Sequence, residues 1–156
     1  MIMALRRLST LLLFFALIGT AQSAYAQQSM RFRGSDGWGA GTRYESLFDN
    51  LNLQTVTGTV VRVDTATVIF GEMSVAVRLV VALDGGSEIP VHLGPMWFAL
   101  NQDVNFPRGE KLEIRGHRTS FSGAEFIMPV EMRSKNRIFR FRDDDGNPFW
   151  SIHRPR

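Results

Sequence analysis

The stretch SVAVRLVVALDGGSEIPVHLGPMWFALNQ (residues 74–102) decides the fold that the sequence predicts. Its first ten residues are rich in valine and alternate in character, and the turn DGGS (84–87) separates them from a second run, 88–93. Asp, Gly and Ser between two such runs are typical of a β-hairpin. Gly94-Pro95 then ends the second strand, and proline is favoured in the first turn of the helix expected through Gln102.

Three further strands are predicted outside this hairpin, at 53–63, 111–117 and 124–132, where β-branched residues alternate with polar ones. Gly58 inside the first of them predicts a bulge or a sharp bend. Between residues 51 and 132 the order is therefore strand, strand, strand, short helix, strand, strand. This order predicts an all-β fold, a five-stranded OB-like Greek-key barrel with one short helix between the third and fourth strands.

The barrel is flanked by two segments of different composition. Residues 27–50 are rich in glycine and polar residues and predict an N-terminal arm with at most one helical turn. Residues 133–156 carry seven basic and three acidic residues and form a basic C-terminal tail. In this tail, IFRFR (138–142) predicts a strand that DDDGNP (143–148) turns back into a hairpin.

The first 26 residues predict a secretory signal peptide. Arg6 and Arg7 precede the apolar run from Leu8 to Ile18, and Ala24-Tyr25-Ala26 supplies the small-residue cleavage pattern. The run is too short for a permanent membrane span. We expect cleavage near Ala26 and a periplasmic or secreted protein.

Charge and cysteine content exclude several classes of function. All 15 acidic residues follow Ala26, whereas two of the 18 basic residues precede it, so the mature chain has a net charge of about +1. The sequence contains no cysteine, which excludes covalent c-type haem, thiol redox chemistry, thiolate metal sites and a lipid anchor on cysteine.

Five motifs together resemble a family of small, exported, largely uncharacterised bacterial proteins. The motifs are GWGAGTRYESLFD (37–49), VTGTVVRVD (56–64), IPVHLGPMWF (89–98), RGEKLEIRGHRTSFSG (108–123) and FRDDDGNPFWS (141–151). The resemblance implies an OB-like barrel with a Gly-Trp-Gly arm in front of it and an Arg-Asp-x-x-Gly-x-Pro-x-Trp segment at its end. It implies an exported location and no established activity.

The histidines His92, His117 and His153 are candidates for a metal site, which would require them to converge in space. The alternative is that His92 donates a hydrogen bond at a strand end. The scattered methionines are expected to fill the core rather than to bind copper. The aspartates of 143–147 are expected in a hairpin turn rather than in a calcium loop.

Aromatic and basic residues supply the candidates for ligand binding, namely His92, Trp97, Trp38, Trp150, Arg140 and Arg142. Arginines interleaved with phenylalanines, as in RIFRFR (137–142), are typical of single-stranded nucleic-acid or polyanion binding. In a regular strand, however, Phe139 and Phe141 face one way and Arg140 and Arg142 the other. An ordinary amphipathic strand therefore explains the pattern, and nucleic acid is an improbable partner outside the cytoplasm.

The favoured interpretation is an exported, non-catalytic binding or accessory module of the cell envelope. The sequence lacks GxSxG, HExxH and Walker motifs, so we expect no enzyme activity and no cofactor. The partner is expected to be an envelope protein or a small ligand. We expect Trp38 and Trp150 to pack the arm and the tail on the barrel, and Trp97 with Phe98 to plug its open end.

Overall fold

The computed structural model describes residues 37–71, 73–102 and 104–152. The predicted signal peptide, the Arg31-Phe32-Arg33 segment and His153 lie outside the described residues. The elements are η1 (Glu45–Leu47), β1 (Leu53–Thr67), β2 (Ala76–Leu83), β3 (Glu88–Pro95), α2 (Met96–Asn101), β4 (Lys111–Phe121), β5 (Ala124–Ser134), β6 (Arg137–Arg140) and α3 (Phe149–Ile152).

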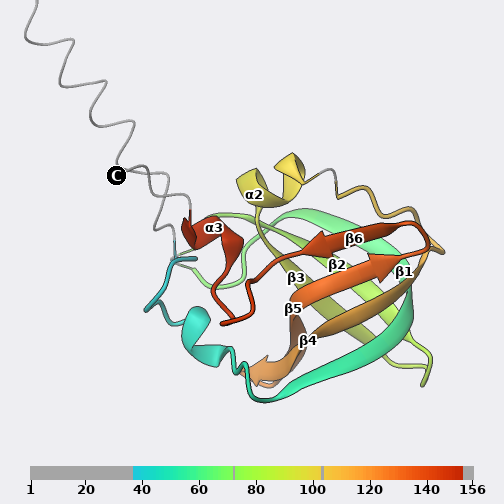
Figure 1. The fold of residues 1–156 in the computed structure, drawn as a ribbon, viewed down its shortest axis with the longest axis horizontal. Coiled ribbons are helices and arrows are strands. Elements are labelled where there is room, and N and C mark those ends of the chain that lie inside the picture. Colours follow the sequence, from blue (N-terminus) through green and yellow to red (C-terminus); the bar gives the residue numbers. More distant parts are fainter. Residues whose placement is uncertain (1–36, 72, 103, 153–156) are drawn as a thin grey trace, which may run out of the picture. The chain divides into compact units, whose positions relative to one another are not determined.

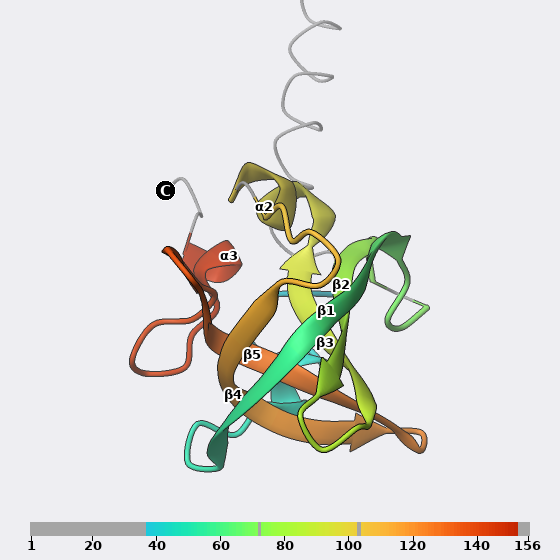
Figure 2. The ribbon, with the colours of Figure 1, turned by 90° about the vertical axis from the view of Figure 1, so that its right-hand side faces the viewer.

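The strands close into a ring. In the described part of the chain, six strands form one sheet in the order β3-β2-β1-β4-β5-β6, and a further pairing joins β3 to β5 (Figure 1). That pairing is parallel, with Val91 opposite Ile127, and β6 lies outside the ring as a partner of β5. The second view shows the strands crossing around a common centre (Figure 2). The predicted all-β, barrel-like fold with a short helix between its third and fourth strands is confirmed.

β1 belongs to both sides of the barrel because it is long and pairs with a different strand along each half. Its first half pairs with β4 and its second half with β2, and Gly58 has a partner on each side. A Cβ atom at Gly58 would lie 2.5 Å from Val81 Cγ1 and 2.6 Å from the Ala82 carbonyl oxygen, so glycine is needed for this close packing. The irregularities of β1 lie after Gly58, between Val60 and Arg62 and between Asp64 and Thr67.

The core contains inward-facing aliphatic side chains of the strands together with two methionines. Met128 and Met132 are fully buried, in agreement with their predicted role as core residues. The other fully buried aliphatic side chains from the strands include Val60, Val77, Leu79, Val81, Val91, Leu93, Ile114 and Ile127.

The tail departs from the predicted hairpin. β6 ends at Arg140, a single bridge joins Arg142 to Pro148, and the predicted returning strand is instead the short helix α3. The Phe141 and Arg142 amides both approach the Val130 carbonyl, so the regular alternation stops after Arg140. Phe141 is buried in the core and Arg142 is buried against Phe48 and Glu45 of the arm, so the segment after Arg140 is not the ordinary amphipathic strand that the sequence predicted.

The prediction that Trp97 and Phe98 of α2 plug the open end of the barrel is right for Phe98 and wrong for Trp97. Phe98 is 6% exposed and packs against Trp150, with ring centroids 5.2 Å apart, whereas Trp97 is 41% exposed. Adjacent residues on a helix point about 100° apart, so a one-sided helix buries only one of them. Phe98 closes this end of the barrel, and Trp97 is not a plug. Over the described ranges no helix is long and apolar enough to cross a bilayer.

Gly94 links the barrel to the tail and provides a test of this packing. It has a φ of +106°, and a Cβ atom there would lie 2.7 Å from Trp150 Cζ3. We expect Gly94→Ala to lower the free energy of unfolding by about 3 kcal/mol, because it adds both backbone strain and overlap with the indole. Urea denaturation measures the loss.

Gly85→Ala is the matched control, because no atom lies within 4 Å of the Cβ position at Gly85. It should change the stability by less than about 1 kcal/mol. Equal effects of the two substitutions would contradict the described packing of Trp150 on Gly94.

Candidate functional site

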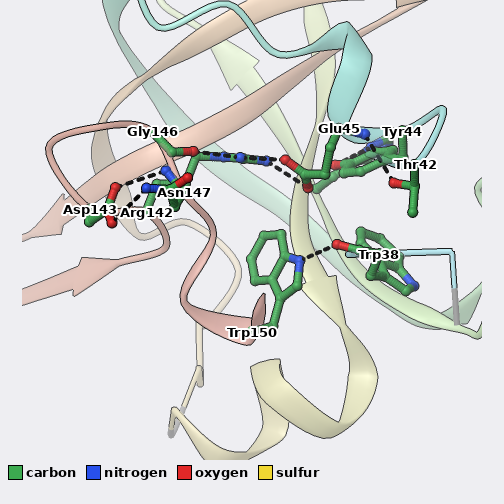
Figure 3. A network of polar contacts seen from close by, with 10 residues as sticks. Trp38, Thr42, Tyr44, Glu45, Arg142, Asp143, Gly146, Asn147 and Trp150 are labelled. Atoms are coloured by element: carbon green, nitrogen blue, oxygen red, sulfur yellow. Dashed lines mark hydrogen bonds and ion pairs between the residues drawn. The ribbon is translucent and has the colours of Figure 1, made fainter. Parts of the chain in front are cut away.

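The arm and the tail meet at one end of the barrel. The Trp150 indole N–H donates a hydrogen bond of 2.9 Å to the Trp38 carbonyl, and the two rings meet edge to face at 6.0 Å (Figure 3). The Trp38 indole N–H in turn donates to the Ser74 carbonyl at 3.1 Å, in the β1–β2 connection. Both tryptophans are buried, so their rings join chain segments and are not open to a ligand.

Arg142 and Glu45 form a second connection between tail and arm. Arg142 Nη1 donates to Glu45 Oε2 at 2.7 Å, Nη2 donates to Oε1 at 3.2 Å, and Nη1 also donates to the Gly146 carbonyl at 2.9 Å. The Arg142 side chain is 1% exposed and its guanidinium carbon lies 4.0 Å from the Phe48 ring centre. Figure 3 shows the guanidinium between Gly146 and Glu45. We call Trp38, Glu45, Arg142 and Trp150 the arm–tail clasp.

Burial of this ion pair has an electrostatic cost that its geometry offsets only in part. Burial raises the pKa of Glu45, while the hydrogen bonds and charge of Arg142 oppose that shift. The bidentate hydrogen bonds and the aromatic face of Phe48 replace part of the water removed from the guanidinium, but the buried Arg142 Nε has no hydrogen-bond partner. Arg142 is therefore not the polyanion contact that the sequence suggested, because its charge is used inside the protein.

His92 lies under the arm. Its ring stacks on Phe126 at 4.2 Å, and its Nδ1 lies 3.4 Å from the Tyr44 hydroxyl. Burial, together with the nearby Arg78 charge, lowers the pKa of His92 to about 3, so the imidazole is neutral at physiological pH. Burial also raises the pKa of Tyr44 above its ordinary value. His92 is thus a packed, neutral histidine.

The histidines do not converge over the described residues. His92 is on β3 beneath Tyr44, whereas His117 is on β4, where its Nδ1 lies 3.0 Å from the Asn52 carbonyl and its ring meets the edge of Phe48. Within the described ranges, no group of three or more His, Cys, Asp or Glu residues is placed to hold a metal ion. The geometry gives the metal hypothesis no support, and His153 lies outside the described residues.

The arm packs on aromatic side chains at one end of the barrel. The Arg43 guanidinium lies 4.5 Å from the Phe121 ring, at the end of β4, and 5.8 Å from Phe70, in the β1–β2 connection. Tyr44 meets Phe70 edge to face and stacks on Phe126 of β5. The side chains of Arg43 and Tyr44 therefore cover these three aromatic rings.

The two arginines of β6 are paired with neighbouring acids. Arg137 donates to Glu110 at 3.2 Å and to the Asn105 carbonyl at 2.8 Å, and its guanidinium lies 5.1 Å from the Phe139 ring. Arg140 donates to Glu131 at 3.3 Å. The basic strand therefore presents ion pairs rather than a row of free guanidinium groups.

An open groove of about 290 Å³ lies between the arm and the 145–148 loop. Several of its polar side chains have partners within the chain. Thr42 Oγ1 accepts from the Glu45 amide at 3.4 Å, and Glu45 pairs with Arg142. In the same loop the Asp143 carboxylate accepts from the amides of Asp145 and Asn147, as a turn aspartate does.

The sequence did not identify Glu45 or Tyr44 as site residues. Helical spacing of Tyr44, Leu47 and Phe48 indicated a short helical turn, and the turn η1 is found there. Nothing in the spacing of Glu45 and Arg142, 97 residues apart, indicated that they pair.

Removal of one partner of the ion pair should lower the free energy of unfolding more than removal of both partners. Arg142→Leu leaves Glu45 buried without its counter-ion, so we expect the free energy of unfolding to fall by about 3 kcal/mol. The double variant Glu45→Leu with Arg142→Leu should recover part of that loss. Arg118→Ala, which breaks a solvent-exposed pair with Glu125, should cost less than about 1 kcal/mol. Equal losses for Arg142→Leu and Arg118→Ala in denaturant titrations would contradict this description.

The neutral state of His92 predicts a pH dependence of stability. The unfolded chain binds a proton at His92 near its ordinary pKa of 6.5, whereas the folded chain does so only near 3. Stability should therefore fall as the pH drops below 6.5, by up to about 1.4 kcal/mol per unit. Thermal unfolding between pH 7 and pH 5 measures the slope. His92→Gln should flatten it, and His117→Gln should leave it unchanged, so a slope that persists in His92→Gln would refute this origin.

Comparison with known proteins gives one match. A model of the MamS/MamX magnetosome protein family matches residues 52–139, which include the barrel strands and α2. The arm and the end of the tail, with all four residues of the arm–tail clasp, lie outside the matched segment. No curated protein and no solved structure matches the chain.

Proposed function

Because this chain belongs to the MamS/MamX magnetosome protein family, we propose that it is an exported, non-catalytic accessory module associated with magnetosomes. Its role is to present the outer surface of a stable barrel to a partner. The family match covers more than half of the chain and includes the barrel, which supports a shared role for this part of the molecule.

The observation that carries this proposal is that the candidate reactive side chains contact other groups inside the protein. The side chains with the strongest claim to chemistry are His92, Glu45 and Arg142, and all three are packed or paired inside the protein. Catalysis requires groups that reach a substrate, and polyanion binding requires free cationic groups. The remaining exposed surface favours contact with another molecule over chemistry.

The polyanion alternative has less support. Arg137 and Arg140 pair with Glu110 and Glu131, and Arg43 and Tyr44 of the arm lie on the rings of Phe121 and Phe126. A nucleic acid would have to displace these contacts before it could bind there. Surface contact therefore remains the favoured mode of action.

The proposal is tested by recovery of the protein with isolated magnetosomes. In a magnetosome-forming host, we expect an epitope-tagged full-length chain to be recovered with the magnetosome fraction. A variant with His117→Gln and Arg140→Gln, which removes partly exposed chemical groups without disturbing the core, should be recovered within about twofold of the unmodified chain.

Two results would contradict the proposal. Absence of the unmodified chain from the magnetosome fraction would remove the association itself. Loss of recovery in the double variant, with an unchanged melting temperature, would indicate that imidazole or guanidinium chemistry at these positions is needed.

A further inference from the structure

β6 forms an open edge of the sheet. Over the described residues it pairs with β5 alone, and it is the last strand in the order β3-β2-β1-β4-β5-β6 (Figure 1). A strand at the edge of a sheet presents backbone N–H and C=O groups with which a further strand can pair. The register between β5 and β6 determines which groups these are.

The backbone groups of Ile138 and Arg140 point away from β5. The Phe141 amide donates to the Val130 carbonyl at 2.9 Å, and the same register continues back through β6 without a shift. In an antiparallel pair, residues bonded across the two strands alternate with residues whose N–H and C=O point outward. Phe139, two residues before Phe141, therefore bonds to β5, whereas Ile138 and Arg140 present their backbone groups at the outer edge.

This outer edge is accessible. In the described part of the chain, no backbone hydrogen bond from a turn or loop ends on Ile138 or Arg140. The loop before β4 packs on the other face of the strand, where the ring centroids of Phe106 and Phe139 lie 4.8 Å apart. The Ile138 side chain points to the outward face and is 59% exposed. Unpaired backbone groups and an exposed apolar side chain therefore occur together.

The outward face beside this edge has a surplus of positive charge. Residues 111–115, 131–133 and 138–140 lie side by side on β4, β5 and β6. They carry four basic and two acidic side chains, a net charge of +2, namely Lys111, Arg115, Arg133 and Arg140 against Glu113 and Glu131. Arg133 is opposite Ile138, and its side chain is 56% exposed. The balance stays positive when any one of the arginines is replaced.

We propose that the outer edge of β6 binds an extended segment of a partner protein as an added strand, with acidic and apolar side chains on the outward face of that segment. The backbone of the segment pairs with the N–H and C=O groups of Ile138 and Arg140. An apolar side chain covers Ile138, and acidic neighbours complement the positive face. Main-chain hydrogen bonds contribute most of the affinity, so the contact tolerates Arg140→Gln, which leaves the backbone in place.

This proposal rests on the proposed surface-contact role and identifies the surface and the class of partner. Its test uses a purified chain and a synthetic peptide. Failure of the peptide to bind would leave recovery with magnetosomes untouched, and failure of that recovery would leave peptide binding untouched.

The probe is the peptide acetyl-TETVTETV-amide, whose glutamates and valines alternate on one face of an extended strand. It is titrated into the ¹⁵N-labelled chain of residues 27–156, the form expected after cleavage near Ala26. We expect NMR shift changes centred on β6 at peptide concentrations below about 1 mM. Replacement of the glutamates by lysines should weaken binding several-fold. Methylation of the backbone nitrogens should abolish it, because the donors are lost.

Amide hydrogen exchange of the unmodified chain reports on the edge directly. In the free chain, the Ile138 and Arg140 amides should exchange faster than the Phe139 amide, which is bonded to β5. A saturating concentration of the peptide should slow exchange at Ile138 and Arg140 at least about tenfold. This measurement needs no variant, so it stays decisive if a variant fails to fold.

A matched pair of variants separates the backbone from the side chain. Ile138→Pro removes one outward N–H without removing a bond to β5, so it should fold and lower the peptide affinity at least about tenfold. Ile138→Thr keeps the N–H and the β-branched shape and should stay within about threefold of the unmodified chain. Melting temperatures of both variants verify that the barrel is intact.

Four results would overturn the proposal. The first is no binding at 1 mM peptide. The second is equal binding of the backbone-methylated peptide, which would reduce the contact to adsorption by charge. The third is self-association of the free chain that Ile138→Pro abolishes in analytical ultracentrifugation, because a second copy would then occupy the edge. The fourth is stronger protection of the same amides by a single-stranded oligonucleotide than by the peptide.

Discussion

The indole of Trp150 is the contact on which the arrangement of arm, barrel and tail depends. Its N–H is bonded to the Trp38 carbonyl, its ring edge lies against Gly94 of β3, and its ring and that of Phe98 of α2 meet edge to face. A barrel without disulfides must obtain its stability from packing alone. One buried aromatic residue of the tail here joins three segments that are far apart in the sequence, namely the arm, the β3–α2 segment and the tail itself.

A consequence of this packing is that several polar side chains contact other side chains of the same protein. Arg142 pairs with Glu45, the Tyr44 hydroxyl approaches His92, and the Arg43 guanidinium lies over the Phe121 ring. These interactions join the arm to the barrel and to the tail, whereas Trp97 and Leu100 of α2 stay exposed.

The sequence predicted the barrel more successfully than the site. Alternation and the DGGS turn depend on local backbone preferences, and the strands lie where these preferences indicated. Whether Trp97 or its neighbour Phe98 is buried depends on which of them packs against Trp150. Phe98 does so, and Trp150 lies 52 residues beyond it in the sequence. Arg142 was misplaced because alternation was extended beyond the end of β6, and its partner Glu45 is too distant in sequence for any local pattern to indicate the pair.

Hydrogen exchange measured by mass spectrometry tests most directly whether arm, barrel and tail form one cooperative unit. The Phe48 amide of the arm and the Phe149 amide of the tail are bonded to backbone carbonyls. If the clasp holds, peptides covering 44–50 and 141–150 should be protected to a similar free energy of opening as peptides from β4 and β5. Rapid exchange in either segment while the barrel strands stay protected would show that the arm or the tail opens independently and would contradict this interpretation.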